Sequence, residues 1–205
     1  MNDDLGFLGI KEGKHEPVPA IGTGSCKTAE TTTLVRSGEN LKPAETRLFS
    51  DPYAIRFVRP ELLAWFTTHP TELQEIVRVE ERRFPGMNSA IVARTRYFDD
   101  IIGESLNNGL EQLVIVGAGF DARAHRIPGL SGNVRIFELD QLETQAVKQA
   151  KVREIFGQIP NHVTYVPADL RTSTWQQDLV RNGYDPVKKP SLLWRGSACI
   201  CHRIP

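Results

Sequence analysis

The feature that most constrains the fold is a short apolar run that ends in two glycines. Residues Gln112–Val116 (QLVIV) are almost wholly apolar, and Gly117, Ala118 and Gly119 follow directly. A run this short and this apolar is typical of a parallel strand buried on both faces. Glycines after such a strand permit a tight turn and a close approach of the backbone to a ligand. The sequence therefore predicts a parallel sheet with a ligand site at the end of this strand.

Three further strands are predicted, and helical patterns separate them. The strands are expected at Val134–Leu139, Val163–Val166 and Ser191–Trp194, and the helices at Ala122–Arg126, Leu142–Phe156 and Trp175–Asn182. Strand alternating with helix is the pattern of βαβ units, which build an open parallel sheet. We therefore expect an α/β fold with about four parallel strands.

The composition and hydrophobic patterns differ in the part of the chain that precedes this sheet. Residues 1–27 are polar and rich in Gly and Pro, which predicts a flexible leader. Residues 28–109 carry mostly helical patterns and form a predicted N-terminal helical cap. Within it, Thr71 is the expected N-cap of one helix, and a further helix is expected at Ile91–Leu106. Residues 110–205 then form the ligand-binding sheet domain.

Composition excludes several classes of partner. The chain has 25 Lys and Arg against 25 Asp and Glu, so it offers no electrostatic footprint for nucleic acid. It contains neither an apolar run long enough for a membrane span nor a signal peptide, and we expect a cytoplasmic protein. Cys199, Cys201 and His202 lie close together, but their spacing fits no usual zinc pattern, so no metal is expected.

Two carboxylates follow the second and third predicted strands. Asp140 lies 23 positions after Gly117, the distance at which an acid accepts hydrogen bonds from a ribose diol. Asp169 could accept a hydrogen bond from an adenine amino group, with Leu170 against the ring. Each acid alone could be an ordinary N-cap. A glycine turn and two acids after successive strands together form the layout of an adenosine pocket.

The kind of adenosine ligand is less constrained. The run from Gly117 to Ala122 (GAGFDA) also fits the dinucleotide fingerprint, so an NAD(P)-dependent oxidoreductase stays open, as does an inactive remnant of a nucleotide-binding fold. Phe120 and Asp121 occupy the place where a pyrophosphate would lie, and a carboxylate there would repel a diphosphate. It would be better tolerated beside a sulfonium, which favours S-adenosyl-L-methionine.

Several longer stretches resemble a known family. They are VARTRYFDD (92–100), EQLVIVGAGFDARAHRI (111–127), VRIFELDQ (134–141), HVTYVPADL (162–170) and TRLFSDPYAIRFV (46–58). They are similar to the leucine carboxyl methyltransferase-like family, most of all to its bacterial, mycobacterial-type branch. The resemblance covers about residues 28–194. It implies a Rossmann-like class I methyltransferase sheet, S-adenosyl-L-methionine as cofactor, and O-methylation of a carboxylate or hydroxyl on a small molecule or peptide.

The resemblance also implies a role for one arginine outside the sheet. Arg94 would grip the methionine carboxylate of the cofactor, a task that suits the bidentate geometry of a guanidinium. Arg96 is an adjacent competitor for that role. Without the resemblance, the sequence indicates only an ordinary solvated arginine on a helix at Arg94.

The remaining roles that the resemblance implies fall on the strand ends. Gly117 and Gly119 would pass under the methionine part of the cofactor. Asp140 would hold the ribose hydroxyls, and Asp169 and Leu170 would fix the adenine. The resemblance identifies neither a catalytic residue nor the methyl acceptor, and it leaves the oligomeric state open.

The likeness to the family ends after Trp194. Arg195 stands where the family has a glutamate, and residues 195–205 do not continue the pattern. We therefore expect a C-terminally truncated member with an incomplete sheet. Its fourth strand would form an exposed apolar edge, and the chain would be poorly soluble or weakly active.

Overall fold

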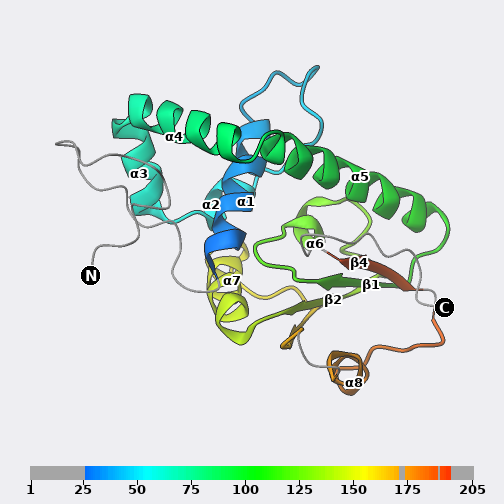
Figure 1. The fold of residues 1–205 in the computed structure, drawn as a ribbon. Helices are drawn as coiled ribbons and strands as arrows, with labels where there is room; N and C mark the ends of the chain where they lie inside the picture. Colours follow the sequence, from blue (N-terminus) through cyan, green and yellow to red (C-terminus); the bar gives the residue numbers. More distant parts are fainter. Residues whose placement is uncertain (1–25, 171–173, 189, 195–205) are drawn as a thin grey trace.

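The computed structural model describes residues 26–170, 174–188 and 190–194 (Figure 1). The predicted leader lies outside these residues except for its last two positions. The departure from the family pattern at Arg195 and the cluster of Cys199, Cys201 and His202 also lie outside them.

The described residues form one sheet of four parallel strands in the order β3-β2-β1-β4. The strands are β1 (Gln112–Val116), β2 (Arg135–Asp140), β3 (Val163–Pro167) and β4 (Pro190–Trp194). The predicted Rossmann-like α/β sheet is therefore confirmed, and each strand lies within one residue of its expected position at either end. The strand order reverses between β1 and β4, so the carboxyl end of β1 is the switch point at which such sheets bind ligands.

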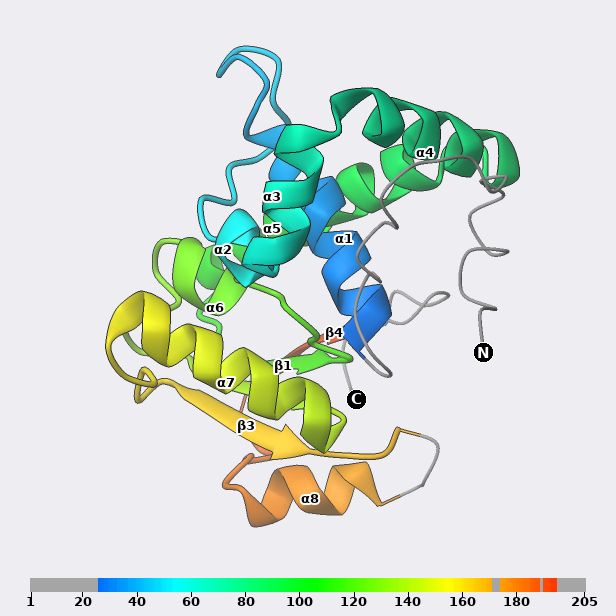
Figure 2. The ribbon, with the colours of Figure 1, turned by 90° about the vertical axis from the view of Figure 1, so that its left-hand side faces the viewer.

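Both faces of β1 are buried, which explains its apolar sequence. Leu113 and Ile115 belong to a core that includes Phe98 and Ile102, whereas Val114 and Val116 belong to a second core on the opposite face. The helices that follow the strands are α6 (Arg123–Arg126), α7 (Leu142–Phe156) and α8 (Trp175–Arg181). Figure 2 shows α7 and α8 on opposite faces of the sheet.

The helical part before the sheet covers its carboxyl end and one face (Figures 1 and 2). Its helices are α1 (Cys26–Glu39), α2 (Ala54–Phe57), α3 (Pro60–Thr68), α4 (Pro70–Arg83) and α5 (Met87–Asn107). The longest, α5, buries Ile91, Thr95, Phe98 and Ile102, a spacing that forms one face of a helix. No helix within the described ranges is long and apolar enough to cross a membrane.

Two predicted helix starts were wrong. Thr71 is not the N-cap of α4, because Pro70 takes the first helical position and His69 precedes it. Proline suits that position, since its missing N–H would have no partner there. Helix α5 begins at Met87, four residues before the expected Ile91, directly after Gly86, whose φ is 76°.

Helix α1 is buried through polar side chains. Glu30, Thr33, Arg36 and Glu39 recur every three residues, and each is at most 2% exposed. Glu30 accepts hydrogen bonds from the amide and the Nε of Arg59, both at 3.1 Å, and Glu39 accepts one from the Leu48 amide at 2.7 Å. The helix therefore docks by specific polar contacts rather than by an apolar stripe.

A buried ion pair joins the middle of the sheet to α7. Glu138 of β2 is 0% exposed and pairs with Lys148, which is 1% exposed. The Gln145 amide nitrogen donates to the carbonyls of Glu138 at 2.7 Å and Val166 at 3.1 Å. Burying this pair costs desolvation free energy for both ions. That cost is offset only when each ion has its partner.

Removing one partner of this pair is expected to destabilise the fold strongly. Lys148→Met removes the cation that pairs with the buried Glu138 carboxylate, which costs about 3–5 kcal/mol. The double variant Lys148→Met with Glu138→Leu removes both charges and should recover most of that loss. Urea unfolding of the three proteins measures the difference, and a double variant no more stable than the single one would contradict this account.

Candidate functional site

The glycine turn after β1 has the backbone geometry that only glycine adopts easily. Gly117 and Gly119 have φ values of 67° and 49°. The turn is held by backbone hydrogen bonds from the Ala118 amide to the Leu139 carbonyl at 3.0 Å and from the Asp121 amide to the Ala118 carbonyl at 2.8 Å. The turn is therefore tied to the end of β2 as well as to β1.

Asp140 lies beside this turn at the end of β2. Its Oδ2 accepts a hydrogen bond from the Gly119 amide at 2.6 Å, and its Oδ1 accepts one from the Gln141 amide at 2.7 Å. The side chain is half-buried. An ionised carboxylate has about four acceptor positions, so two remain for a ligand. The structure thus brings together Gly119 and Asp140, which the sequence predicted to share a site.

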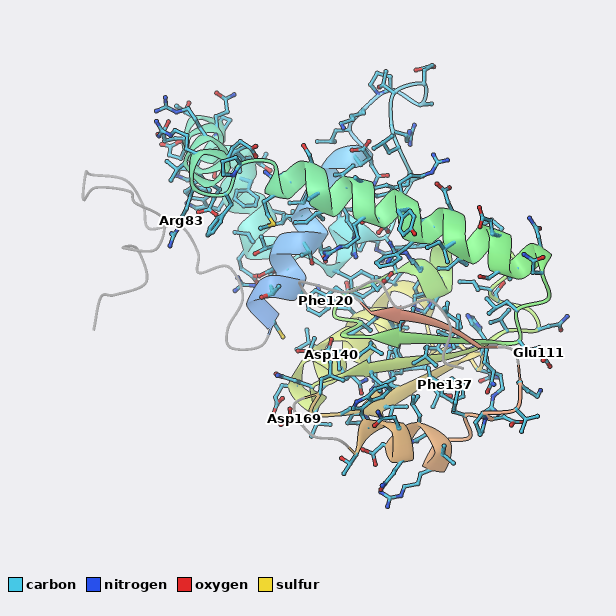
Figure 3. The ribbon with its side chains drawn as sticks, turned by 45° about the vertical axis from the view of Figure 1, so that its right-hand side comes forward. Arg83, Glu111, Phe120, Phe137, Asp140 and Asp169 are labelled. Atoms are coloured by element: carbon cyan, nitrogen blue, oxygen red, sulfur yellow. The ribbon has the colours of Figure 1, made fainter. Side chains whose placement is uncertain are left out.

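Asp169 and Leu170 follow β3 at the same edge of the sheet. The Ala168 amide donates to the Asp140 carbonyl at 2.9 Å, which ties the end of β3 to the end of β2. Figure 3 shows Asp140 and Asp169 at the edge opposite Glu111, which precedes β1. Asp169 is exposed, and Leu170 packs against the core on the α8 face. The two predicted adenine contacts therefore flank the site rather than pointing into a closed pocket.

Arg94 lies on α5, next to the buried Thr95, and is half-buried. Burial lowers the pKa of Arg94, nearby Arg123 lowers it further, and Asp121 opposes the shift. Within the described part of the chain, its guanidinium makes no hydrogen bond or ion pair. Arg96, by contrast, is exposed and bonds to Asp100 at 2.8 Å. Of the two arginines, Arg94 is the one that keeps its charge available for an anion.

The structure corrects the argument based on Asp121. This carboxylate is 1% exposed, and Arg123 binds it through Nη1 at 2.6 Å and through its backbone amide at 2.8 Å. Phe120 is also buried, and it stacks with Phe57. Neither side chain crowds a ligand at the turn, because both point into the protein. The charge argument against a diphosphate is therefore wrong.

The start of α1 forms part of the site, which the sequence did not indicate. A Cβ on Gly119 would lie 3.2 Å from the Ala29 Cβ and 4.0 Å from the Asp140 Oδ2. Glycine is thus needed at 119 for its conformation and for the close approach of α1. The only sequence feature that could have indicated this contact is the small side chain of Ala29. A single alanine in a helix does not identify a contact with another segment.

His125 of α6 is partly buried. Its ring stacks on Phe156 with a centroid distance of 4.7 Å. Burial lowers its pKa to about 4, and the nearby Lys148 and His162 act in the same direction. His125 is therefore neutral at physiological pH and packs against Phe156.

The described residues contain no group of three or more His, Cys, Asp or Glu side chains that could hold a metal ion. The groups that the sequence predicts as a site are a glycine turn, a half-buried carboxylate and the Arg94 guanidinium, which has no hydrogen bond or ion pair among the described residues. These groups suit an organic ligand that carries both a diol and an anionic group.

Comparison with known proteins connects this chain to one family. The model of the leucine carboxyl methyltransferase family matches residues 29–200. A relative from Mycolicibacterium vanbaalenii is 34% identical over 186 residues, which are 87% of this chain and 57% of the relative. One from Frankia alni is 32% identical over 176 residues, covering 86% and 57% of the two chains. One from Mycobacterium avium is 30% identical over 170 residues, covering 81% and 55%.

All three relatives are provisionally named S-adenosyl-L-methionine-dependent methyltransferases. The chain spans only a little over half the length of each of them.

The close approach at Gly119 predicts a difference between two glycine substitutions. Gly109→Ala and Gly119→Ala both place a side chain at positive φ, which costs about 1 kcal/mol. Gly109 has open space around its Cβ position, whereas Gly119 faces Ala29 at 3.2 Å. Gly119→Ala should therefore lower the free energy of unfolding more than Gly109→Ala does. Equal losses in urea unfolding would show that the α1 contact is not tight.

The buried state of His125 predicts a pH effect on stability. Between its ordinary pKa of 6.5 and the folded value of about 4, the unfolded chain binds a proton that the folded chain does not. Stability should therefore fall as the pH drops through this window, by about 2–3 kcal/mol at its lower end. His125→Phe keeps the stack on Phe156 and lacks the titration. Its free energy of unfolding should change less between pH 7 and pH 4.5, and parallel curves would contradict the assignment.

Proposed function

The chain belongs to the leucine carboxyl methyltransferase family, and on that premise we propose that it binds S-adenosyl-L-methionine and transfers its methyl group to an acceptor oxygen. The cofactor would lie along the carboxyl ends of β1, β2 and β3. The names of the relatives support this ligand. The observation that carries the proposal is the hydrogen bond between the Gly119 amide and Asp140, because it joins a closely approachable backbone to a ribose acceptor.

Asp140 is the proposed ribose ligand. The hydrogen bonds that it accepts from two backbone amides fix the orientation of its carboxylate. Its remaining acceptor positions are therefore already in place when the diol arrives. Gly117 and Gly119 would pass beneath the methionine part, since a turn without side chains lets the ligand approach the backbone. Asp169 and Leu170 are the proposed adenine contacts, one as acceptor and the other as apolar surface.

Arg94 is the proposed partner of the methionine carboxylate. Its guanidinium makes no hydrogen bond or ion pair among the described residues, whereas Arg123 is paired with Asp121 and Asp99. A half-buried cation of this kind favours an incoming anion, because water screens it less than it screens a surface charge. A carboxylate bound there would also oppose the depression of the Arg94 pKa.

The reaction that we propose is O-methylation of a carboxylate or hydroxyl acceptor. The bound cofactor supplies an electrophilic methyl group on a sulfonium. The protein's own contribution is to hold that group in line with the acceptor oxygen and to exclude water. A carboxylate acceptor needs no general base, which accords with a site where the His125 ring is stacked on Phe156. We propose residues 28–109 as the cap that shapes the acceptor site and residues 110–205 as the cofactor-binding domain.

Titration calorimetry tests the ligand. We expect S-adenosyl-L-methionine and S-adenosylhomocysteine to bind, and NAD to bind far more weakly. Arg94→Met should weaken binding about 10- to 100-fold, as expected for loss of a charge-assisted hydrogen bond.

Arg96→Met is the matched control. It removes an arginine two positions away on the same helix, where the side chain is exposed and bonded to Asp100. Its affinity should equal that of the wild type. Binding of NAD without S-adenosylhomocysteine, or equal losses in the two arginine variants, would overturn the proposal.

A further inference from the structure

Six charged side chains, four of them buried and two partly buried, form a continuous set of contacts around the end of the glycine turn. We refer to them as the charge ring. Its members are Arg36 of α1, Asp51 before α2, Asp99 of α5, Asp121 of the turn, and Arg123 and Arg126 of α6. Three are cations and three are anions, so the ring is neutral as a whole.

The ring starts and ends at neighbouring residues. Arg36 Nη2 donates to the Phe120 carbonyl at 2.6 Å, and Arg36 Nε lies 3.3 Å from Asp51 Oδ2. Arg126 continues the path, with Nε 3.7 Å from the same Asp51 oxygen.

From Arg126 the contacts return to the turn. Arg126 Nη2 and Arg123 Nε both lie 2.7 Å from the Asp99 carboxylate. Arg123 Nη1 then reaches Asp121 at 2.6 Å. The path thus begins at the carbonyl of Phe120 and closes on the side chain of Asp121.

The two halves of the ring differ in character. The half through Asp99 and Asp121 consists of hydrogen bonds, whereas the contacts of Asp51 with Arg36 and Arg126 are ion pairs without hydrogen-bond geometry. Burial lowers the pKa of Arg36, and Asp51 and Asp121 oppose that shift. Burial also acts to lower the pKa of Arg123, but Asp121 and Asp99 outweigh it and raise the pKa.

Such a buried ring is an expensive way to gain stability alone. Arg36, Asp51, Asp121 and Arg123 are each at most 1% exposed. Desolvation of buried ions offsets much of their attraction, and apolar residues of similar volume would often serve the fold equally well. What the ring adds is geometric specificity, since every contact fixes a direction as well as a distance.

The charge ring contacts the chain directly after the glycine turn. Phe120 and Asp121 directly follow Gly119, and glycines lose more conformational freedom on ordering than other residues do. We infer that the charge ring fixes the shape of the glycine turn and couples it to the helical cap, and that Arg36 is a positioning residue for cofactor binding. Arg36 acts through the Phe120 carbonyl and does not touch the ligand. This inference rests on the proposed function.

Two variants separate this role from a purely structural one. Arg36→Met leaves Asp51 partly uncompensated and removes the donor to Phe120. The double variant Arg36→Met with Asp51→Asn makes the ring neutral again, and an asparagine keeps an oxygen for the Ala54 amide, which Asp51 accepts at 3.1 Å. The double variant should regain most of the lost thermal stability. Both variants should still bind S-adenosylhomocysteine at least about tenfold more weakly than the wild type, since neither restores the charged donor to Phe120.

Glu39→Ala is the matched control. Glu39 is buried on the same helix and binds the Leu48 amide, away from the glycine turn. The variant should lower the melting temperature yet change the affinity by less than about threefold.

A second readout needs no ligand. Hydrogen exchange of the backbone amides of Gly119 and Asp121 reports on the turn directly, because both are hydrogen-bonded within the site. Their exchange should accelerate in the double Arg36 and Asp51 variant and stay unchanged in Glu39→Ala. If the wild type fails to bind S-adenosylhomocysteine, the proposed function fails, and the exchange rates still decide the role of the ring.

The inference is overturned by a stable double variant with wild-type exchange at Gly119 and Asp121. It is equally overturned by wild-type affinity in that variant, or by a Glu39→Ala variant that weakens binding as much as Arg36→Met does. If Arg36→Met alone does not fold, the double variant and the control carry the comparison.

Discussion

The parallel register between β1 and β2 determines where the ligand-binding groups of this protein lie. Val116 pairs with Leu139, so Gly117, which follows β1, lies beside Asp140, the last residue of β2. Alternate residues of a strand face opposite sides of the sheet, and a slip of one residue would turn Asp140 toward the α8 face. The buried pair of Glu138 with Lys148 opposes such a slip, because the slip would turn the Glu138 carboxylate away from α7.

The sheet was predictable because its signals are local. The apolar run of β1 and the bounds Leu142–Phe156 of α7 follow from the sequence pattern alone. The acids at Asp140 and Asp169 were expected at strand ends, and topology alone brings strand ends together. Helix α1 carries no such signal, since its buried stripe is polar and each member depends on a partner from elsewhere in the chain, such as Arg59 for Glu30.

The sequence also could not predict in which direction a side chain points. Asp121 follows the glycines and was expected to face a ligand, yet it turns inward to Arg123. The Asp-x-Arg spacing is a visible part of that contact, but the third partner, Asp99, lies 24 residues before Arg123. Arg94 and Arg96 show the same limit: only their surroundings distinguish the arginine bound to Asp100 from the one without an ionic partner among the described residues.

The charge ring makes six positions depend on one another. A neutral residue at any one of them leaves an odd charge in a space that excludes water, and the cost falls on the whole domain rather than on one contact. Drift at these positions during evolution should therefore proceed by paired exchanges, an acid and a base lost or gained together. A protein that has lost only one of the two charges would fold only if it has stability in excess of what it needs. The residues around the turn should therefore diverge more slowly than the surface of the cap.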